Sequence, residues 1–300
     1  MRKDVERIWE RLAAAATACG LLLVLAFGWQ PARAADDALA ILTIVDGPAQ
    51  LLRGDKRLRA EEGLRLLSQD IIETTADARV TRIEYPDGAA FNLGPSTRVL
   101  IDPQFYGERG RFARLYLLAG WIKMKAVGAG TDAAGRSIPL LASPAIDVID
   151  ADGSLVVQVD DAAVALFIES GSATFHERRD AKPVGEHRRL AAGQFLGRPQ
   201  QGKSTLGGRA APEFIAALPR SFLDTLPDRA ALFASRKPVA KEIGDIGYDD
   251  ARDWLAVEWT LRRPAMKRWQ PLTRDAEFRN ALIANMKAHP EWARVLSRGR

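Results

Sequence analysis

The chain has 300 residues, 47% of them hydrophobic and 27% charged, which is enough apolar sequence for one large core or two smaller ones. A formal net charge of +5 gives no argument for a nucleic-acid partner, because so slight a balance describes an ordinary solvated surface. Cys19 is the only cysteine, so the chain beyond it has no disulfide scaffold, thiolate zinc site or cysteine nucleophile.

Residues 1–34 have the order of a secretory signal peptide. Basic side chains precede an uncharged apolar run over 12–29, and Ala32 and Ala34 form an A-x-A cleavage signal. We expect cleavage between Ala34 and Ala35 and a periplasmic or secreted mature protein. The alternative is an uncleaved membrane anchor, because the run approaches the minimum span of about 18 residues. Only in that case is contact with a membrane expected.

From residue 38 to 198, short runs of β-branched and aromatic residues alternate with Gly, Pro, Asp and Ser about every 8–12 residues. This rhythm predicts a mainly β domain, either a sandwich or a solenoid-like arrangement. The clearest stretch, 78–101, predicts a three-stranded meander with turns at 86–88 and 94–96.

Further turns are expected wherever a glycine follows a small or acidic residue between two apolar runs. Such turns would end a strand at Ala119–Gly120, at Asp152–Gly153 and at Ser170–Gly171. The strand expected after Gly120 has period-two alternation, which predicts one polar and one buried face. The polar face carries Trp121, Lys123 and Lys125, and the apolar face carries Ile122, Met124 and Ala126.

Six short motifs follow one another between residues 46 and 195. They are G-x-A-x-L at 47–51, L-x-x-Q-D-I-I-x-T at 66–74, D-G-x-x-F-x-L-G-x-x-T at 87–97, L-x-G-x-I-x-M at 118–124, the segment 139–149, and I-E-S-G-S-A-T-F at 168–175 with L-x-x-G-Q at 190–194. In this order they resemble the FecR domain, the periplasmic β-module of FecR-type sensory regulators. The resemblance assigns structural turn positions to Asp70, Asp87, Gly88, Gly120, Gly171 and Gly193.

Two positions depart from the pattern of that family. Gln69 stands where the family has glycine, and Ala89 stands where it has a hydroxyl residue. FecR regulators also carry a cytoplasmic helical region that handles a sigma factor. Only about ten residues precede the apolar run here, too few for a stable helical domain. The resemblance therefore implies an exported relative without the anti-sigma region.

The remainder of the chain changes in character. Residues 199–211 are rich in Gly, Gln, Arg and Pro and predict a linker, and 212–300 predict a small helical module. Helices are expected over 249–262, over 264–269 and over 273–287, where Thr273 could act as the N-cap. The predicted core of this module contains Trp254, Trp259, Trp269 and Trp292.

Residues 197–204, G-R-P-Q-Q-G-K-S, match the P-loop pattern letter by letter. A P-loop needs a helix after it, so that backbone amides face the phosphate. Gly207, Gly208 and Pro212 exclude such a helix, and Pro199 removes one amide donor. No nucleotide and no other cofactor is expected.

The remaining candidates for chemistry favour structural roles. His176 and His187 are expected at the two ends of a polar hairpin loop, and His289 at a helix end, so no metal site is predicted. Asp160–Asp161 is interpreted as a turn and Asp249–Asp250 as the start of a helix. The chain contains no Gly-x-Ser-x-Gly motif and no credible serine–histidine pair, so no enzyme is predicted.

The hypothesis that follows is a non-catalytic exported module that binds a cell-envelope protein through exposed strand edges. The alternative is a protein that binds glycan or peptidoglycan, because exposed aromatic rings can stack on sugars. An enzyme whose site does not show in the sequence is the third possibility.

Overall fold

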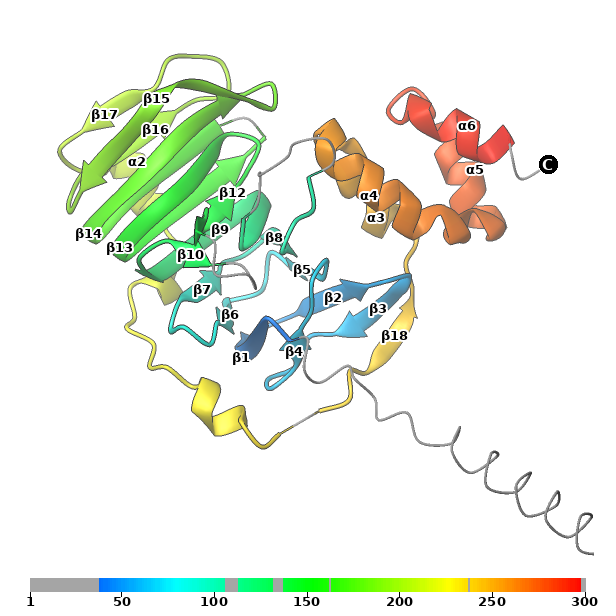
Figure 1. Cartoon of the computed structure of the whole chain (residues 1–300), viewed down its shortest axis with the longest axis horizontal. Coiled ribbons are helices and arrows are strands. Elements are labelled where there is room, and N and C mark those ends of the chain that lie inside the picture. Colours follow the sequence, from blue (N-terminus) through cyan, green and yellow to red (C-terminus); the bar gives the residue numbers. More distant parts are fainter. Residues whose placement is uncertain (1–37, 106–112, 132–136, 162, 237, 298–300) are drawn as a thin grey trace, which may run out of the picture. The chain divides into compact units, whose positions relative to one another are not determined.

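A computed structural model describes residues 38–105, 113–131, 137–161, 163–236 and 238–297. The predicted leader with its Ala34–Ala35 cleavage site lies outside the described residues. The unit from Leu39 onward is mainly β with a small helical C-terminal region (Figure 1), which confirms the predicted fold class.

Sixteen of the described strands join in one hydrogen-bonded sheet. Its main path runs β17-β16-β14-β13-β12-β9-β8-β5-β2-β3-β18, with β1, β4, β6, β7 and β15 attached beside it. The bounds are β1 (Ala40–Asp46), β2 (Ala49–Arg53), β3 (Lys56–Arg59), β4 (Arg65–Leu66), β5 (Ile71–Thr74), β6 (Val80–Glu84), β7 (Ala90–Leu93), β8 (Arg98–Ile101), β9 (Leu115–Val127), β12 (Leu141–Ala142), β13 (Ile146–Asp160), β14 (Ala163–Arg179), β15 (Lys182–Ala191), β16 (Phe195–Arg198), β17 (Thr205–Gly207) and β18 (Glu242–Asp245). A separate pair is formed by β10 (Gly130–Thr131) and β11 (Ser137–Ile138).

The predicted meander is right for two strands and wrong for the third. β6 pairs with β7 across the turn at 86–88, but β8 leaves β7 and pairs with β5 and β9. β7 pairs instead with the second half of β9. The turn at 94–96 therefore passes the chain to another part of the sheet, which local turn residues cannot indicate.

β9 corrects the hairpin predicted at Ala119–Gly120, because one continuous strand runs through both residues. Its first half pairs with β8 and β12, and its second half pairs with β7 and β13. Gly120 lies where the partners change, with φ at +103°. A Cβ atom there would lie 2.4 Å from the Cα atom of Thr97. Gly120 thus allows a kink rather than a turn.

The turns predicted at Asp152–Gly153 and Ser170–Gly171 are also wrong. Gly153 and Gly171 face each other inside the long strands β13 and β14, with φ angles of +96° and +72°. A Cβ atom on Gly171 would lie 1.8 Å from the carbonyl oxygen of Asp152. At this glycine pair β14 exchanges its neighbour β16 for β15, so the glycines permit a change of partner within the sheet.

The region after residue 198 contains more β-structure than predicted. The expected linker 199–211 includes β17, which pairs with β16, and the expected helical module 212–300 includes β18, which pairs with β3. The helical elements are α2 (Pro212–Ala217), η2 (Arg220–Phe222), η3 (Ala230–Phe233), α3 (Tyr248–Ala256), α4 (Trp259–Trp269), η4 (Gln270–Arg274), α5 (Ala276–Ala284), η5 (Pro290–Trp292) and α6 (Ala293–Ser297).

Helix boundaries differ from the prediction at two points. The helix expected over 249–262 ends at Ala256, and α4 continues through Pro264 to Trp269. The N-cap of α5 is Asp275, whose side chain accepts a hydrogen bond from the Phe278 amide, rather than Thr273. Trp254, Trp269 and Trp292 are buried as predicted, whereas Trp259 is 48% exposed.

The β-strands and the C-terminal helices share one core. A buried cluster joins Leu52, Ile71 and Tyr116 from strands with Trp254 and Trp269 from helices. The indole nitrogen of Trp254 donates to Glu73, and that of Trp269 donates to the carbonyl oxygen of Gly54. Among the residues described, no helix combines the length and apolar character needed to cross a membrane.

Candidate functional site: a strap across the sheet

The motif residues from the sequence hold the fold in place. Asp70 is 1% exposed, accepts a hydrogen bond from the Leu67 amide and binds the Arg53 guanidinium through both carboxylate oxygens, at 2.8 and 2.6 Å. Gln69, at the position where the family has glycine, has φ at +69°, which explains why glycine suits this turn. Asp70 is therefore an anchor for its turn and is already fully engaged.

Asp87 and Gly88 form the turn between β6 and β7, as predicted. Asp87 accepts a hydrogen bond from the Ala89 amide and pairs with Arg114, which is 5% exposed and lies over the Tyr85 ring. The Arg114 guanidinium lowers the pKa of the Asp87 carboxyl below its usual value. Gly88 has φ at +88°, a conformation that favours glycine.

Gly193 lies in the turn from β15 to β16, with φ at +82°. Next to it, the Gln194 side chain accepts a hydrogen bond from the Ala191 amide at 2.8 Å. With Gly120 and Gly171 inside strands, all six motif residues thus have structural positions, although only Asp70, Asp87, Gly88 and Gly193 lie in or beside turns.

His289 lies at a helix end as predicted, at the N-cap of η5, whereas His176 and His187 do not lie at the ends of a loop. His176 is in β14 and His187 in β15, so the expected polar loop between them is largely a strand pair. Their ring centroids are 4.7 Å apart, and His176 Nε2 lies 2.9 Å from the carbonyl oxygen of Gly185. His289 is buried against the Tyr248 hydroxyl, and burial lowers its pKa.

The other candidate motifs also have local structural roles. Gly197 belongs to β16, exposed Lys203 lies in the following loop, and β17 rather than a helix comes next. Asp161 has φ at +47° in the turn after β13, and Asp250 accepts a hydrogen bond from the Gly247 amide at the start of α3. Within the described ranges, no group of three or more His, Cys, Asp or Glu side chains could hold a metal ion.

A feature that the sequence did not indicate is a segment crossing the sheet, residues 212–236, which we call the strap. In Figure 1 it is the yellow segment that leaves β17 and passes β7 and β6 on its way to β18. Three phenylalanines of the strap are buried: Phe214, Phe222 and Phe233. Phe214 contacts the rings of Trp121 and Phe195, with centroids 5.4 and 5.1 Å away.

The strap lies along the polar face of β9. Ile122, Met124 and Ala126 are buried in the main core, as predicted. On the opposite face Trp121 meets Phe214, the Lys123 ammonium donates to the carbonyl oxygen of Phe222, and Lys125 pairs with Asp228 at 2.8 Å. These contacts occur in the same order along both segments.

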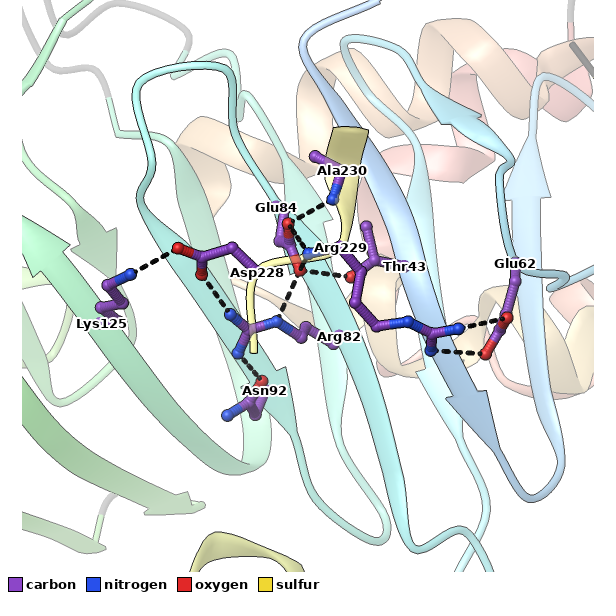
Figure 2. A network of polar contacts seen from close by, with 9 residues as sticks. All are labelled: Thr43, Glu62, Arg82, Glu84, Asn92, Lys125, Asp228, Arg229 and Ala230. Atoms are coloured by element: carbon purple, nitrogen blue, oxygen red, sulfur yellow. Dashed lines mark hydrogen bonds and ion pairs between the residues drawn. The ribbon is translucent and has the colours of Figure 1, made fainter. Parts of the chain in front are cut away.

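Figure 2 shows the polar network that fixes the middle of the strap. Glu84 on β6 accepts hydrogen bonds from Thr43, from Arg82 and from the backbone amides of Arg229 and Ala230, at 2.7 to 3.0 Å. Arg82 and Glu84 are 2% and 4% exposed. The strap therefore covers the Arg82–Glu84 ion pair and supplies two of the donors that form hydrogen bonds with Glu84.

All three guanidinium nitrogens of Arg82 donate hydrogen bonds within the same network. Its remaining nitrogens donate to Asn92 at 2.9 Å and to Asp228 at 3.0 Å (Figure 2). Arg229 adds a more exposed pair with Glu62. Each charged group has an opposite partner, so the buried charges are compensated in the way that a stable interior requires.

The network changes the acidity of its carboxylates. Burial by itself would raise the pKa of Glu84, but hydrogen bonds from Arg82, Thr43 and the two strap amides outweigh it and lower the pKa. The hydrogen bond from Lys125 lowers the pKa of Asp228. Both carboxylates are therefore ionised at neutral pH, as their partners require.

The strap exposes aliphatic side chains among charged ones such as Glu213, Arg220 and Asp224. Each buried phenylalanine has an exposed aliphatic neighbour in sequence: Ile215, Leu223 and Leu232 are 50%, 73% and 62% exposed. All three pairs lie in or at the end of a helical turn, in α2, η2 and η3, where consecutive side chains point in directions about 100° apart. A phenylalanine anchored in the core therefore leaves its neighbour exposed, and we call these three exposed aliphatic side chains the aliphatic row.

The sequence held one signal for this arrangement. Arg82 and Glu84 alternate with Ile83, which lies in the main core, so two charges occupy one face of a strand whose other face is buried. Such a strand is usually solvated on its charged face. No local sequence pattern indicates that residues 146 positions later in the chain cover this charged face.

Comparison with known proteins gives little further information. No family model matches the chain, and no curated protein matches it. Among solved structures, the chain is similar to two crystal structures of a candidate anti-sigma factor from Parabacteroides distasonis, with 14% and 15% identity and a TM-score of 0.34 for each. The match covers 49% of this chain and spans less than two thirds, 62% and 63%, of those chains.

Proposed function

We propose that the protein is a non-catalytic exported module with a FecR-like β-domain, and that it binds a protein of the cell envelope through the strap. The observation that carries this proposal is the aliphatic row, which buried phenylalanines and the Glu84 network hold in a fixed place. Exposed aliphatic side chains on a preorganised backbone lose little conformational entropy on binding.

The strap is a better docking surface than the strand edges that the sequence suggested. β15 is the longest edge strand described, and it pairs only with β14. It carries Lys182, Pro183, Gly185 and Arg189, all of them exposed. Charged residues and proline on an edge oppose the addition of another strand. We therefore place the interaction on the strap.

The proposal does not include catalysis, and the use of the motif residues supports this part. Asp70, Asp87 and Glu84, three acidic groups that sequence or burial would single out, are each bound to an arginine and to backbone amides. Carboxylates held in this way are engaged as hydrogen-bond acceptors, which leaves them poorly suited to proton transfer.

The test uses photo-crosslinking amino acids in the full chain, in cells. Placed at Leu223 or Leu232, they should capture the same protein, whereas an equivalent residue at Ile283, exposed on α5, should not. The purified partner should then bind the wild-type protein and lose affinity for a Leu223→Asp, Leu232→Asp variant of unchanged stability. Capture of the same proteins at all three positions, or an unchanged affinity of the variant for the partner, would contradict the proposal.

Export is tested by the N-terminus of the same captured protein. A chain that starts at Ala35 supports the cleaved leader, and a chain that starts at Met1 shows that the leader is retained.

A glycan remains the second candidate, since one tryptophan of the described part is well exposed. Trp259 is 48% exposed, and the Arg262 guanidinium lies 6.0 Å from its ring centroid. A ring of this kind could stack on a sugar. If the protein co-sediments with peptidoglycan and Trp259→Ala abolishes this, glycan binding is favoured. If the wild-type protein does not co-sediment with peptidoglycan, glycan binding is excluded as the function.

A further inference from the structure

We propose that the C-terminal helical region holds a binding site for a phosphate ester. The site is a cavity of about 560 Å³ formed by the end of α4, η4, α5 and α6. Three cationic side chains line it, namely Lys267, Arg274 and Arg279, and no carboxylate of the described residues does. The apolar part of the lining includes Pro271, Val295 and Leu296.

The three cations of the cavity have no acidic partner among the described residues, in contrast to two other arginines of these helices. Arg252 pairs with Asp249 and Asp253, and Arg262 pairs with Glu291. Within the part of the chain that the structure describes, Lys267, Arg274 and Arg279 form no ion pair. Three positive charges around one cavity repel one another, and an anion relieves that repulsion.

The composition of the cavity favours a phosphate ester over a simple carboxylate. A phosphomonoester carries close to two negative charges at neutral pH, and its oxygens fit the planar nitrogens of arginine. The carbon chain of the ester would contact Pro271, Val295 and Leu296, which a bare inorganic ion cannot use. The ester could be a soluble metabolite or a lipid headgroup, and the chemistry of recognition is the same.

The experiment titrates the full mature chain with inorganic phosphate, phenyl phosphate and benzoate in a calorimeter. Phenyl phosphate should bind more tightly than inorganic phosphate, because it adds apolar contact, and more tightly than the singly charged benzoate. Raising the NaCl concentration should weaken all three, since exposed charges are screened. Vesicles of phosphatidic acid, a lipid phosphomonoester, in phosphatidylcholine test a lipid source by co-sedimentation.

Variants locate the site. Lys267→Gln with Arg274→Gln removes two exposed cations and should weaken phenyl phosphate binding by about tenfold or more. The matched control is Lys287→Gln with Arg294→Gln, which removes two exposed cations of the same helical region outside the cavity and should leave binding unchanged. Retention by vesicles that follows the same pattern identifies a lipid source.

The proposal is overturned if no phosphate compound or vesicle binds saturably. It is also overturned if the two variants weaken binding equally, because the effect would then reflect overall charge. Thermal unfolding of each variant shows whether the substitutions leave the fold intact, and Arg274→Gln alone provides a milder change at an exposed position.

Discussion

At the scale of single residues, two glycines of the motifs share a backbone conformation but differ in their surroundings. Gly120 and Gly88 have φ angles of +103° and +88°. A Cβ atom on Gly120 would lie 2.4 Å from the Thr97 backbone, whereas one on Gly88 would meet nothing within 4 Å. Comparison of the two separates the cost of the conformation from the cost of the collision.

We therefore predict that Gly120→Ala lowers the free energy of unfolding by about 3 to 5 kcal/mol, because both the strained φ and the collision oppose the methyl group. Gly88→Ala should cost only about 1 kcal/mol, from the left-handed conformation alone. Urea denaturation measures both values. Equal losses in the two variants would show that the kink of β9 relaxes easily.

Glu84 is the residue on which the attachment of the strap depends. Replacing it by glutamine removes the charge that compensates buried Arg82 and turns one acceptor oxygen into a donor facing other donors. We expect Glu84→Gln to lower stability by about 2 to 4 kcal/mol. Glu62→Gln, which affects the more exposed pair with Arg229, should cost less than about 1 kcal/mol. Similar losses of stability in Glu84→Gln and Glu62→Gln would contradict the role of Glu84 in attaching the strap.

The difference between wild type and Glu84→Gln should also depend on pH. The folded state lowers the pKa of Glu84, so its contribution to stability is complete above the ordinary pKa of about 4.3 and disappears as the pH falls through the lower folded value. Urea denaturation of both proteins at pH 7 and at pH values below about 4 measures the difference. A difference that stays constant into acid would show that the charge is not responsible.

At the scale of elements, one buried ion pair joins β14 to the start of α4. Arg178 and Glu258 form two hydrogen bonds of 2.9 Å, and their side chains are 1% and 5% exposed. Arg178 also donates to the carbonyl oxygens of Ser143 and Ala181. The pair therefore fixes the direction in which the helical region leaves the sheet.

Glu258→Gln should lower stability by about 3 kcal/mol, because it leaves the Arg178 guanidinium buried with less charge compensation. Glu291→Gln is the control, since the same type of ion pair with Arg262 is more exposed, at 14% and 23%. It should cost about 1 kcal/mol or less. Hydrogen exchange should show faster opening of α3 and α4 in the first variant only. Unchanged exchange there would mean that other contacts hold the junction.

At the scale of the whole described unit, the β-strands and the helices are not separate domains in the energetic sense. β18 pairs with β3, the strap covers β6, β7 and β9, and one buried cluster contains residues from both parts. Removing residues 212–300 would expose Trp121, Phe195 and the Arg82–Glu84 pair to water.

We therefore predict a single unfolding transition for the unit from Leu39 onward, with calorimetric and van't Hoff enthalpies in agreement. A chain that ends at residue 211 should show a broadened transition and bind hydrophobic dyes, since its sheet would lose the covering side chains. Two separate transitions, or a stable and sharply unfolding truncated chain, would contradict the shared core.

The sequence alone determined the fold class and most strand positions. These features depend on local chemistry: period-two alternation places Ile122 and Met124 in the core, and turn residues end β6 and begin β7. The buried tryptophans followed from helical spacing in the same way, except for Trp259.

Only the tertiary structure decided which strands pair and what covers them. A glycine with positive φ ends a strand when the next residues turn back, and only kinks it when new partners continue the ladder, as at Gly120 and Gly171. Likewise, Arg82 and Glu84 would be solvated if the strap did not supply the amides of Arg229 and Ala230. These outcomes depend on contacts between residues far apart in the chain, which no local pattern encodes.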